Sequence, residues 1–237
     1  MTPSLKKRFW EKAVVVPVGD RFTVQLDGRD LRTPAKAPLL LPSQLVAQMV
    51  ADEWMAQEEK VNPETMPATR MANSAIDKVS VNFDAVVSML AEYGGSDLLC
   101  YRATHPAELI AKQENAWDPV LDWARARFQI QLQTTSGIMP VAQPENTQGI
   151  FRNALSEYDS FALSAVHDLI VLSGSLVLGL AVSSNQISTE SGWALSRVDE
   201  DWQAEQWGED EEAKQASEIK RVAFHFAKNF LDSTYGA

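Results

Sequence analysis

Cysteine is nearly absent from this chain. Its 237 residues include a single one, Cys100, which excludes an internal disulfide and a zinc site built from cysteines. Cys100 stands among apolar neighbours in LLCYR, a setting typical of a buried structural thiol. The basic residues 6–8 are not followed by the apolar segment of a signal peptide. We therefore expect a reducing compartment, most simply the bacterial cytoplasm, with a processed matrix protein as the alternative.

Recognisable catalytic signatures are also missing. Three histidines, His105, His167 and His225, lie on separate segments without the spacing of paired metal ligands. The chain contains no glycine-rich phosphate-binding loop and no serine nucleophile elbow. These gaps predict no catalytic residue, no metal site and no cofactor.

Positive charge is in short supply. The chain has 21 Lys and Arg against 32 Asp and Glu, a formal net charge of -11. Such a balance argues against nucleic acid or an anionic membrane as the main partner. It suits solubility, or a partner surface rich in lysine and arginine. With 45% apolar and 22% charged residues, the composition is that of an ordinary globular protein.

No apolar run is long enough to span a bilayer, which takes about 20 residues. The longest extends from Leu169 to Val182. We expect it to form most of one buried helix that starts at Asp159 or Ser160, with Gly174 and Gly179 permitting close packing. Nothing resembles a sustained heptad repeat, so a monomer is expected.

The first 40 residues predict a small antiparallel sheet. Residues 21–26 alternate apolar and polar side chains, Asp27-Gly28 is a hairpin turn signal, and residues 29–33 would form the returning strand. Ser43 is a suitable N-cap for a helix to about Gln57. The expected fold class is α+β: an N-terminal domain of strands and helices over residues 1–93, then an all-helical domain over residues 94–237.

Several helices are expected in the second part of the chain. Proline signals predict one from Pro106 to Ala116 and another from Asp118 to about Phe128. Residues 130–132 alternate in the manner of a short strand. A last helix over about residues 217–231 would bury the following side chains: Ile219, Val222, Ala223, Phe226 and Phe230.

The most unusual stretch extends from Leu195 to Ala213. Residues 199–212 carry eight carboxylates and no basic residue, with two tryptophans among them. Carboxylates beside aromatic rings are costly to desolvate, which favours a basic partner or a binding role. A solvated acidic helix is the alternative that spacing alone leaves open.

As one continuous helix, this stretch would have two distinct faces. Val198 and Trp202 would lie on one apolar stripe. On the opposite side, Glu200 would lie between Trp193 and Trp207.

The sequence of this stretch resembles the C-terminal signature of the assembly chaperones of the F-type ATP synthase head. The matching positions are Asp199, Glu200, Trp202, Gln203, Trp207 and Gly208. The resemblance covers nearly the whole chain. Further matching words, in family order, include KRFW at 7–10, LDGRDLRTP at 26–34, EWMAQ at 53–57, MPATRMANSAIDKV at 66–79, GIMPVAQP at 137–144 and HDLIVLSGSLVLGLAV at 167–182.

The resemblance implies a chaperone without catalysis or cofactor. Members of this family bind the unassembled alpha subunit until the beta subunit replaces them, in bacteria and in the mitochondrial matrix of eukaryotes. The candidate partner-binding residues are Asp199, Glu200, Trp202, Gln203, Glu205, Trp207, Gly208 and Glu209. Glu200 or its neighbours would engage a basic group of the alpha subunit. The alternatives are a small-molecule enzyme that uses the acidic helix in an interdomain cleft, and a general holdase for unrelated clients.

Overall fold

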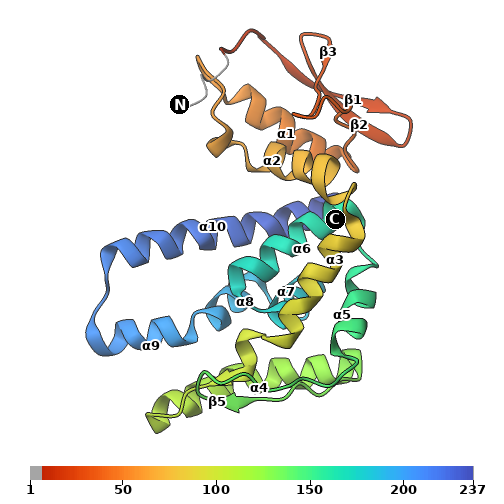
Figure 1. Cartoon of the computed structure of the whole chain (residues 1–237). Coiled ribbons are helices and arrows are strands. Elements are labelled where there is room, and N and C mark those ends of the chain that lie inside the picture. The colour runs from red at the N-terminus through yellow and green to blue at the C-terminus, as the bar shows by residue number, and fades with distance from the viewer. Residues whose placement is uncertain (1–6, 237) are drawn as a thin grey trace. The chain divides into compact units, whose positions relative to one another are not determined.

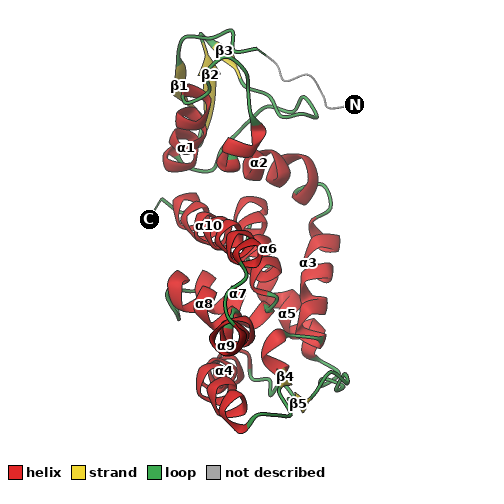
Figure 2. Cartoon of the chain, turned by 90° about the vertical axis from the view of Figure 1, so that its left-hand side faces the viewer, coloured by secondary structure: helices red, strands yellow, loops and turns green. Residues whose placement is uncertain are grey.

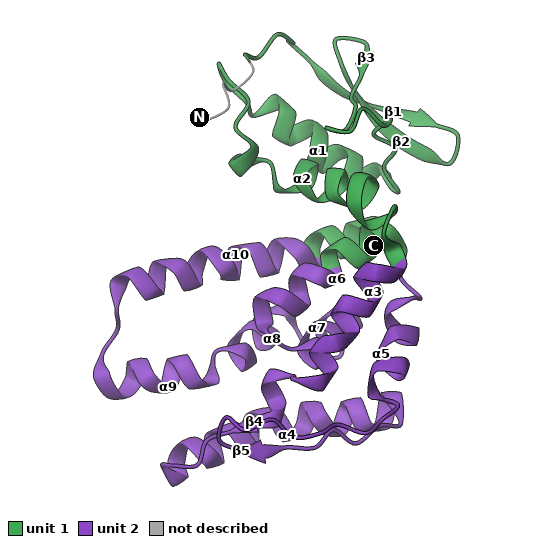
Figure 3. Cartoon of the chain, in the orientation of Figure 1, with its two compact units in different colours: residues 1–83, 159–165, 229–237 green, residues 84–158, 166–228 purple. Residues whose placement is uncertain are grey.

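The computed structural model describes residues 7–236, and its chain divides into two compact units. Unit 1 contains the N-terminal residues up to Phe83 together with residues 159–165 and the C-terminal residues from Asn229, and unit 2 contains residues 84–158 and 166–228 (Figures 1 and 3). A three-stranded antiparallel sheet near the N-terminus precedes a largely helical remainder (Figure 2). The expected α+β class is therefore confirmed. The division into domains at residues 93 and 94 stays a prediction.

Unit 1 begins with the sheet, whose strands have the order β1-β2-β3. Its elements are β1 (Ala13–Val18), β2 (Arg21–Leu26), β3 (Arg29–Asp30), α1 (Gln44–Met55), a 3₁₀ turn (Pro63–Thr65), α2 (Pro67–Ser74) and a π-helical turn (Ala75–Val79). The predicted hairpin turn is confirmed, with positive φ angles of 47° at Asp27 and 80° at Gly28. The Asp27 carboxylate also accepts hydrogen bonds from the backbone N–H groups of Glu11 and Lys12.

Side-chain oxygens accept hydrogen bonds from the backbone at the start of both α1 and α2. Ser43 caps α1 as expected: its Oγ accepts a hydrogen bond from the backbone N–H of Val46 at 3.1 Å. Glu53 of α1 accepts from the backbone N–H groups of Ala68 and Thr69 at the start of α2. Burial of Glu53 raises its pKa, although these hydrogen bonds act in the opposite direction. The Glu53 bonds thereby join α1 to α2, and α1 also packs against β1 and β2.

Unit 2 is built mainly from helices. Its elements, with helix ends that extend into unit 1, are α3 (Phe83–Glu92), 3₁₀ turns at Tyr93–Gly95 and Leu98–Cys100, β4 (Tyr101–Arg102), α4 (Ala107–Phe128), β5 (Thr135–Ser136), α5 (Thr147–Leu155), α6 (Ser160–Ser173), α7 (Leu176–Ser183), α8 (Thr189–Ser196), α9 (Val198–Trp207) and α10 (Glu211–Thr234). Within unit 2, α4 packs against α7 and α9, and α7 packs against α8.

The expectation of one long apolar helix up to Val182 is wrong, because the chain breaks between α6 and α7. Gly174 has a φ of +69°, and the Ser175 Oγ caps α7 by accepting from the backbone N–H of Leu178. The close packing expected at Gly179 is confirmed: a Cβ added there would lie 2.5 Å from the Cγ1 of Ile170. The same expectation for Gly174 is wrong, because a Cβ added there would meet nothing within 4 Å. None of the helices within residues 7–236 is both long and apolar enough to cross a lipid bilayer.

Two further expectations in unit 2 are corrected. Residues 107–128 form one helix with Pro119 inside it, rather than two helices. Pro119 and Asn115, whose carbonyl loses its helical donor, are both exposed, so water can bond that carbonyl. No strand forms at residues 130–132; Ile130 and Leu132 are buried on an irregular segment, and the short parallel pair β4-β5 uses Thr135–Ser136 instead. The alternating burial at residues 130–132 therefore reflects side-chain packing, without the hydrogen bonds that would pair a strand with its neighbour.

Candidate functional site

The sequence suggested that the acidic stretch forms one continuous helix, and this expectation is wrong. It comprises the end of α8, the whole of α9 and the start of α10. Gly208 ends α9 with a φ of +93°, a backbone conformation that residues with a side chain rarely adopt. Asp210 then caps α10, because its Oδ1 accepts from the backbone N–H groups of Glu212 and Ala213. The acids are therefore presented on two helices joined by a short connection.

One face of α9 is held by α4. Gln113, which is almost fully buried, donates from Nε2 to the Asp199 carboxylate at 2.6 Å. Lys112 donates to Glu205 at 2.8 Å, and its Nζ lies 5.7 Å from the centroid of the Trp202 ring. Three of the candidate partner-binding residues therefore make contacts within unit 2 that fix α9 in place.

The opposite face differs from the arrangement expected for a continuous helix. Trp193 belongs to α8 and is only 5% exposed, with its ring 5.7 Å from that of Phe224. Glu200 pairs with Arg197 at 2.8 Å, one turn away. Trp207, at the end of α9, is 79% exposed. Glu200 is therefore not enclosed by two indoles, and Trp207 is free to contact another molecule.

The last helix begins earlier than expected and buries a different set of residues. Ile219 is 66% exposed and Val222 is 57% exposed, whereas both were expected in the core. The prediction for Phe230 is confirmed, since its side chain is fully buried. The first turns of α10 have no core to cover, so apolar periodicity there does not report burial.

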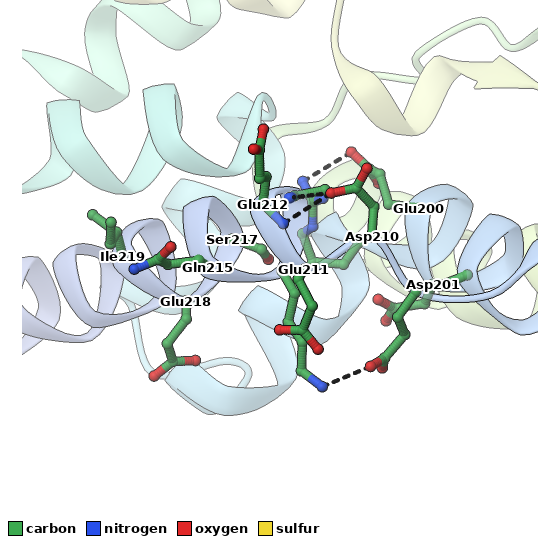
Figure 4. A pocket seen from close by; sticks show the side chains of 14 residues that line it. Glu200, Asp201, Asp210, Glu211, Glu212, Gln215, Ser217, Glu218 and Ile219 are labelled. Atoms are coloured by element: carbon green, nitrogen blue, oxygen red, sulfur yellow. Dashed lines mark hydrogen bonds and ion pairs between the residues drawn. The ribbon is translucent and has the colours of Figure 1, made fainter.

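A hollow of about 900 Å³ lies between α9 and the first turns of α10 (Figure 4). Its lining residues are Arg197, Glu200, Asp201, Ala204, Glu209, Asp210, Glu211, Glu212, Ala213, Lys214, Gln215, Ser217, Glu218 and Ile219. The volume is within the range of sites that enclose a small ligand or a few side chains. Carboxylates dominate its polar lining.

The charges around this hollow are incompletely balanced. Burial raises the pKa of Asp201, although the nearby cations Arg197 and Lys112 lower it. Lys214 donates to Glu209 at 2.6 Å, and this hydrogen bond raises the pKa of the lysine. A cation brought into the hollow would therefore meet carboxylates whose negative charge is only partly offset.

The single cysteine and two of the histidines make contacts typical of structural residues. Cys100 is fully buried, and burial raises the pKa of its thiol to about 12, so the expectation of a buried thiol is confirmed. His167 contacts Asp168, and His225 contacts Glu190 at 3.1 Å. Across residues 7–236, no three side chains of His, Cys, Asp or Glu are grouped so that they could hold a metal ion.

Sequence reasoning named α9 but missed its surroundings. Lys112 and Gln113 on α4 could not be identified, because their contacts depend on how distant helices pack. Asp201 was not named as a binding residue although it lies in the same acidic run, and Ile219 was expected in the core. The remaining named residues stay on the accessible part of α9 and the connection after it: Glu200, Gln203, Trp207, Gly208 and Glu209.

Comparisons with known proteins give a consistent result. The family model described as "ATP12 chaperone protein" matches residues 7–125. The crystal structure of Atp12 from Paracoccus denitrificans is 44% identical, with a TM-score of 0.91, over 96% of this chain and 98% of that one. A variant of that bacterial Atp12 with lysine in place of an aspartate is 43% identical, with a TM-score of 0.91, over 96% of this chain and 97% of that one. The mitochondrial protein atp12 of Schizosaccharomyces pombe is 24% identical over 219 residues, which cover 87% of this chain and 75% of the relative.

Proposed function

Because the chain belongs to the ATP12 chaperone family, we propose that it binds the unassembled alpha subunit of the F-type ATP synthase head. In this proposal it keeps the alpha subunit from aggregating until the beta subunit replaces it. The protein acts as a monomer, without cofactor or catalysis, in the bacterial cytoplasm. Membership of a chaperone family favours this role over that of a small-molecule enzyme.

One observation carries the choice of surface: Trp207 is 79% exposed at the end of α9, amid carboxylates. A tryptophan supplies a large apolar contact area and is enriched where interfaces derive most of their binding energy. The carboxylates around it add orientation and faster association with a basic surface. A mixed surface of this kind suits a client that must be bound and later released.

The physical need for such a chaperone follows from ring assembly. A ring subunit that lacks its neighbours exposes the apolar interfaces that those neighbours will cover. A chaperone that covers one of them prevents aggregation, and the proper neighbour displaces it by making the better interface. Glu200, held by Arg197 at 2.8 Å, is a positioned carboxylate for a cation of the client.

The proposal is tested by direct binding of purified alpha subunit to the protein and its variants. Trp207→Ala and Glu200→Lys should each weaken binding by about tenfold or more, the loss typical of an important interface residue. Ile138→Ala and Glu157→Lys are matched controls, since both positions are exposed elsewhere in unit 2. Circular dichroism establishes that each variant keeps the fold. Unchanged affinity of Trp207→Ala and Glu200→Lys would refute the proposed surface.

A further inference from the structure

The starting point is a pair of helices that are joined but scarcely packed together. α9 packs against α4 and has hardly any contact with α10. Figure 1 shows α9 and the first half of α10 extending from the same short connection. The space between them is the hollow described above, about 900 Å³ in volume. Neighbouring helices normally bury a shared apolar seam, so these two lack a partner on their facing sides.

Apolar side chains are exposed at this place. Ile219 lines the hollow and is 66% exposed, and Val222, one turn further along α10, is 57% exposed. Ala204 of α9 and Ala213 of α10 also line the hollow and leave room for larger side chains between the helices. Spacing of three residues puts Ile219 and Val222 on one face of α10, which is the pattern of a helix awaiting an apolar partner.

The charge of the lining specifies the partner further. The only two cations among the lining residues, Arg197 and Lys214, are already paired with Glu200 and Glu209, at 2.8 and 2.6 Å. Among the described residues, Asp201, Glu211 and Glu212 take part in no ion pair. Figure 4 shows Glu212 and Asp201 extending from the two different helices. An occupant with lysine or arginine beside its apolar residues would complement this lining.

The walls of the hollow also favour one backbone conformation for the occupant. Both are helices, whose backbone groups are bonded internally, so no strand edge is present there to pair with an extended segment. A helix brings its own hydrogen bonds and needs only side-chain contacts. Helix-in-groove recognition uses apolar anchors spaced three and four residues apart, which the exposed pair on α10 can match.

We propose that the hollow between α9 and α10 receives one amphipathic, basic helical segment of the partner protein. Its apolar face packs on Ile219, and its lysines or arginines lie near Asp201 and Glu212. The identity of the partner rests on the proposed function, whereas the chemistry of the occupant does not. The two can therefore fail separately.

The burial of Cys100 makes a site-specific test practical. Because this is the one cysteine of the chain and is fully buried, an added surface cysteine can be labelled selectively. Gln215→Cys places a benzophenone photocrosslinker in the hollow, and Lys220→Cys places it on α10 outside the lining. The probe is a leucine–lysine peptide designed as an amphipathic helix. Its leucine–glutamate counterpart controls for charge.

The lysine peptide should crosslink at position 215 and scarcely at position 220, and the glutamate peptide at neither. Ile219→Asp should weaken binding of the lysine peptide by about tenfold. Val171→Asp, at an apolar position that is 41% exposed elsewhere in unit 2, should leave it unchanged. Equal crosslinking at both positions, or unchanged binding of the lysine peptide to Ile219→Asp, would overturn the inference.

The same reagents separate this inference from the proposed function. Alpha subunit that crosslinks at position 215, and that competes with the lysine peptide, supports both. Peptide capture at position 215 without any binding of alpha subunit would refute the proposed client and leave the chemistry of the hollow standing. Alpha subunit that is bound and protected without crosslinking at position 215 would refute the hollow as its site and leave the client standing.

Discussion

Asp97 shows how one residue can determine a local structure. Its side chain is fully buried, and its Oδ1 accepts from the Ser175 hydroxyl at 2.7 Å and from the Leu99 N–H at 3.0 Å. Its Oδ2 accepts from the Val177 N–H at 3.0 Å, at the start of α7. These bonds satisfy helix donors that would otherwise be orphaned. Burial, which costs the ionised form more than the neutral form, raises the pKa of Asp97.

That raised pKa predicts a pH dependence with a definite sign. The unfolded carboxyl has a pKa near 3.8, so the ionisation penalty on the folded state is absent below that pH. The penalty grows as the pH rises toward the higher folded-state pKa. Acidification through the folded-state pKa toward pH 3.8 should therefore raise the free energy of unfolding of the wild type relative to Asp97→Asn, which does not titrate. Urea titrations of both proteins at several pH values measure the difference, and a flat or opposite trend would contradict the assignment.

At the scale of elements, structure fixed by neighbouring residues could be predicted from the sequence, whereas structure fixed by contacts between distant segments could not. The Ser43 cap and the Asp27-Gly28 turn are fixed by residues adjacent in sequence, so both could be predicted. The break at Gly174 could not, because α7 is held at its start by Asp97 from a distant segment. Periodicity likewise predicted Ile219 in the core, since a pattern of apolar residues does not reveal whether anything covers them.

The exposed stripe of α10 gives a stability prediction. Ile219→Ser should change the free energy of unfolding by less than about 0.5 kcal/mol, as is usual for surface substitutions. Phe230→Ala, at a fully buried position of the same helix, should cost about 3–5 kcal/mol. Chemical denaturation of the two variants tests this contrast. A large loss for Ile219→Ser would mean that the first turns of α10 are covered within the molecule.

Two helical glycines provide a second contrast between elements. An added Cβ at Gly179 would lie 2.5 Å from a side-chain atom and 3.1 Å from a backbone atom of Ile170, whereas one at Gly149 of α5 would meet open space. Gly179→Ala should therefore destabilise the protein by about 1–3 kcal/mol, despite the helix propensity of alanine. Gly149→Ala should stabilise it by roughly 0.5–1 kcal/mol. Thermal melts distinguish the two, and stabilisation by Gly179→Ala would contradict the close packing of α6 and α7.

At the scale of the whole molecule, the family could be predicted from the sequence, whereas the binding surface stays a proposal. Family words spread along the chain implied the chaperone family, and the match over residues 7–125 confirms that membership. A net charge of -11 suits a basic partner, and that partner stays a prediction. The candidate surface could not be predicted from the sequence, because it depends on helix packing: α9 faces α4 on one side and the hollow on the other.

The chaperone function is tested most directly by measuring, with light scattering, the aggregation of isolated alpha subunit with and without this protein. An unrelated aggregating protein provides the client control. We expect suppression for the alpha subunit alone, relieved when beta subunit is added. Equal suppression of the unrelated client would indicate a general holdase, and unchanged aggregation of the alpha subunit would contradict the proposed function outright.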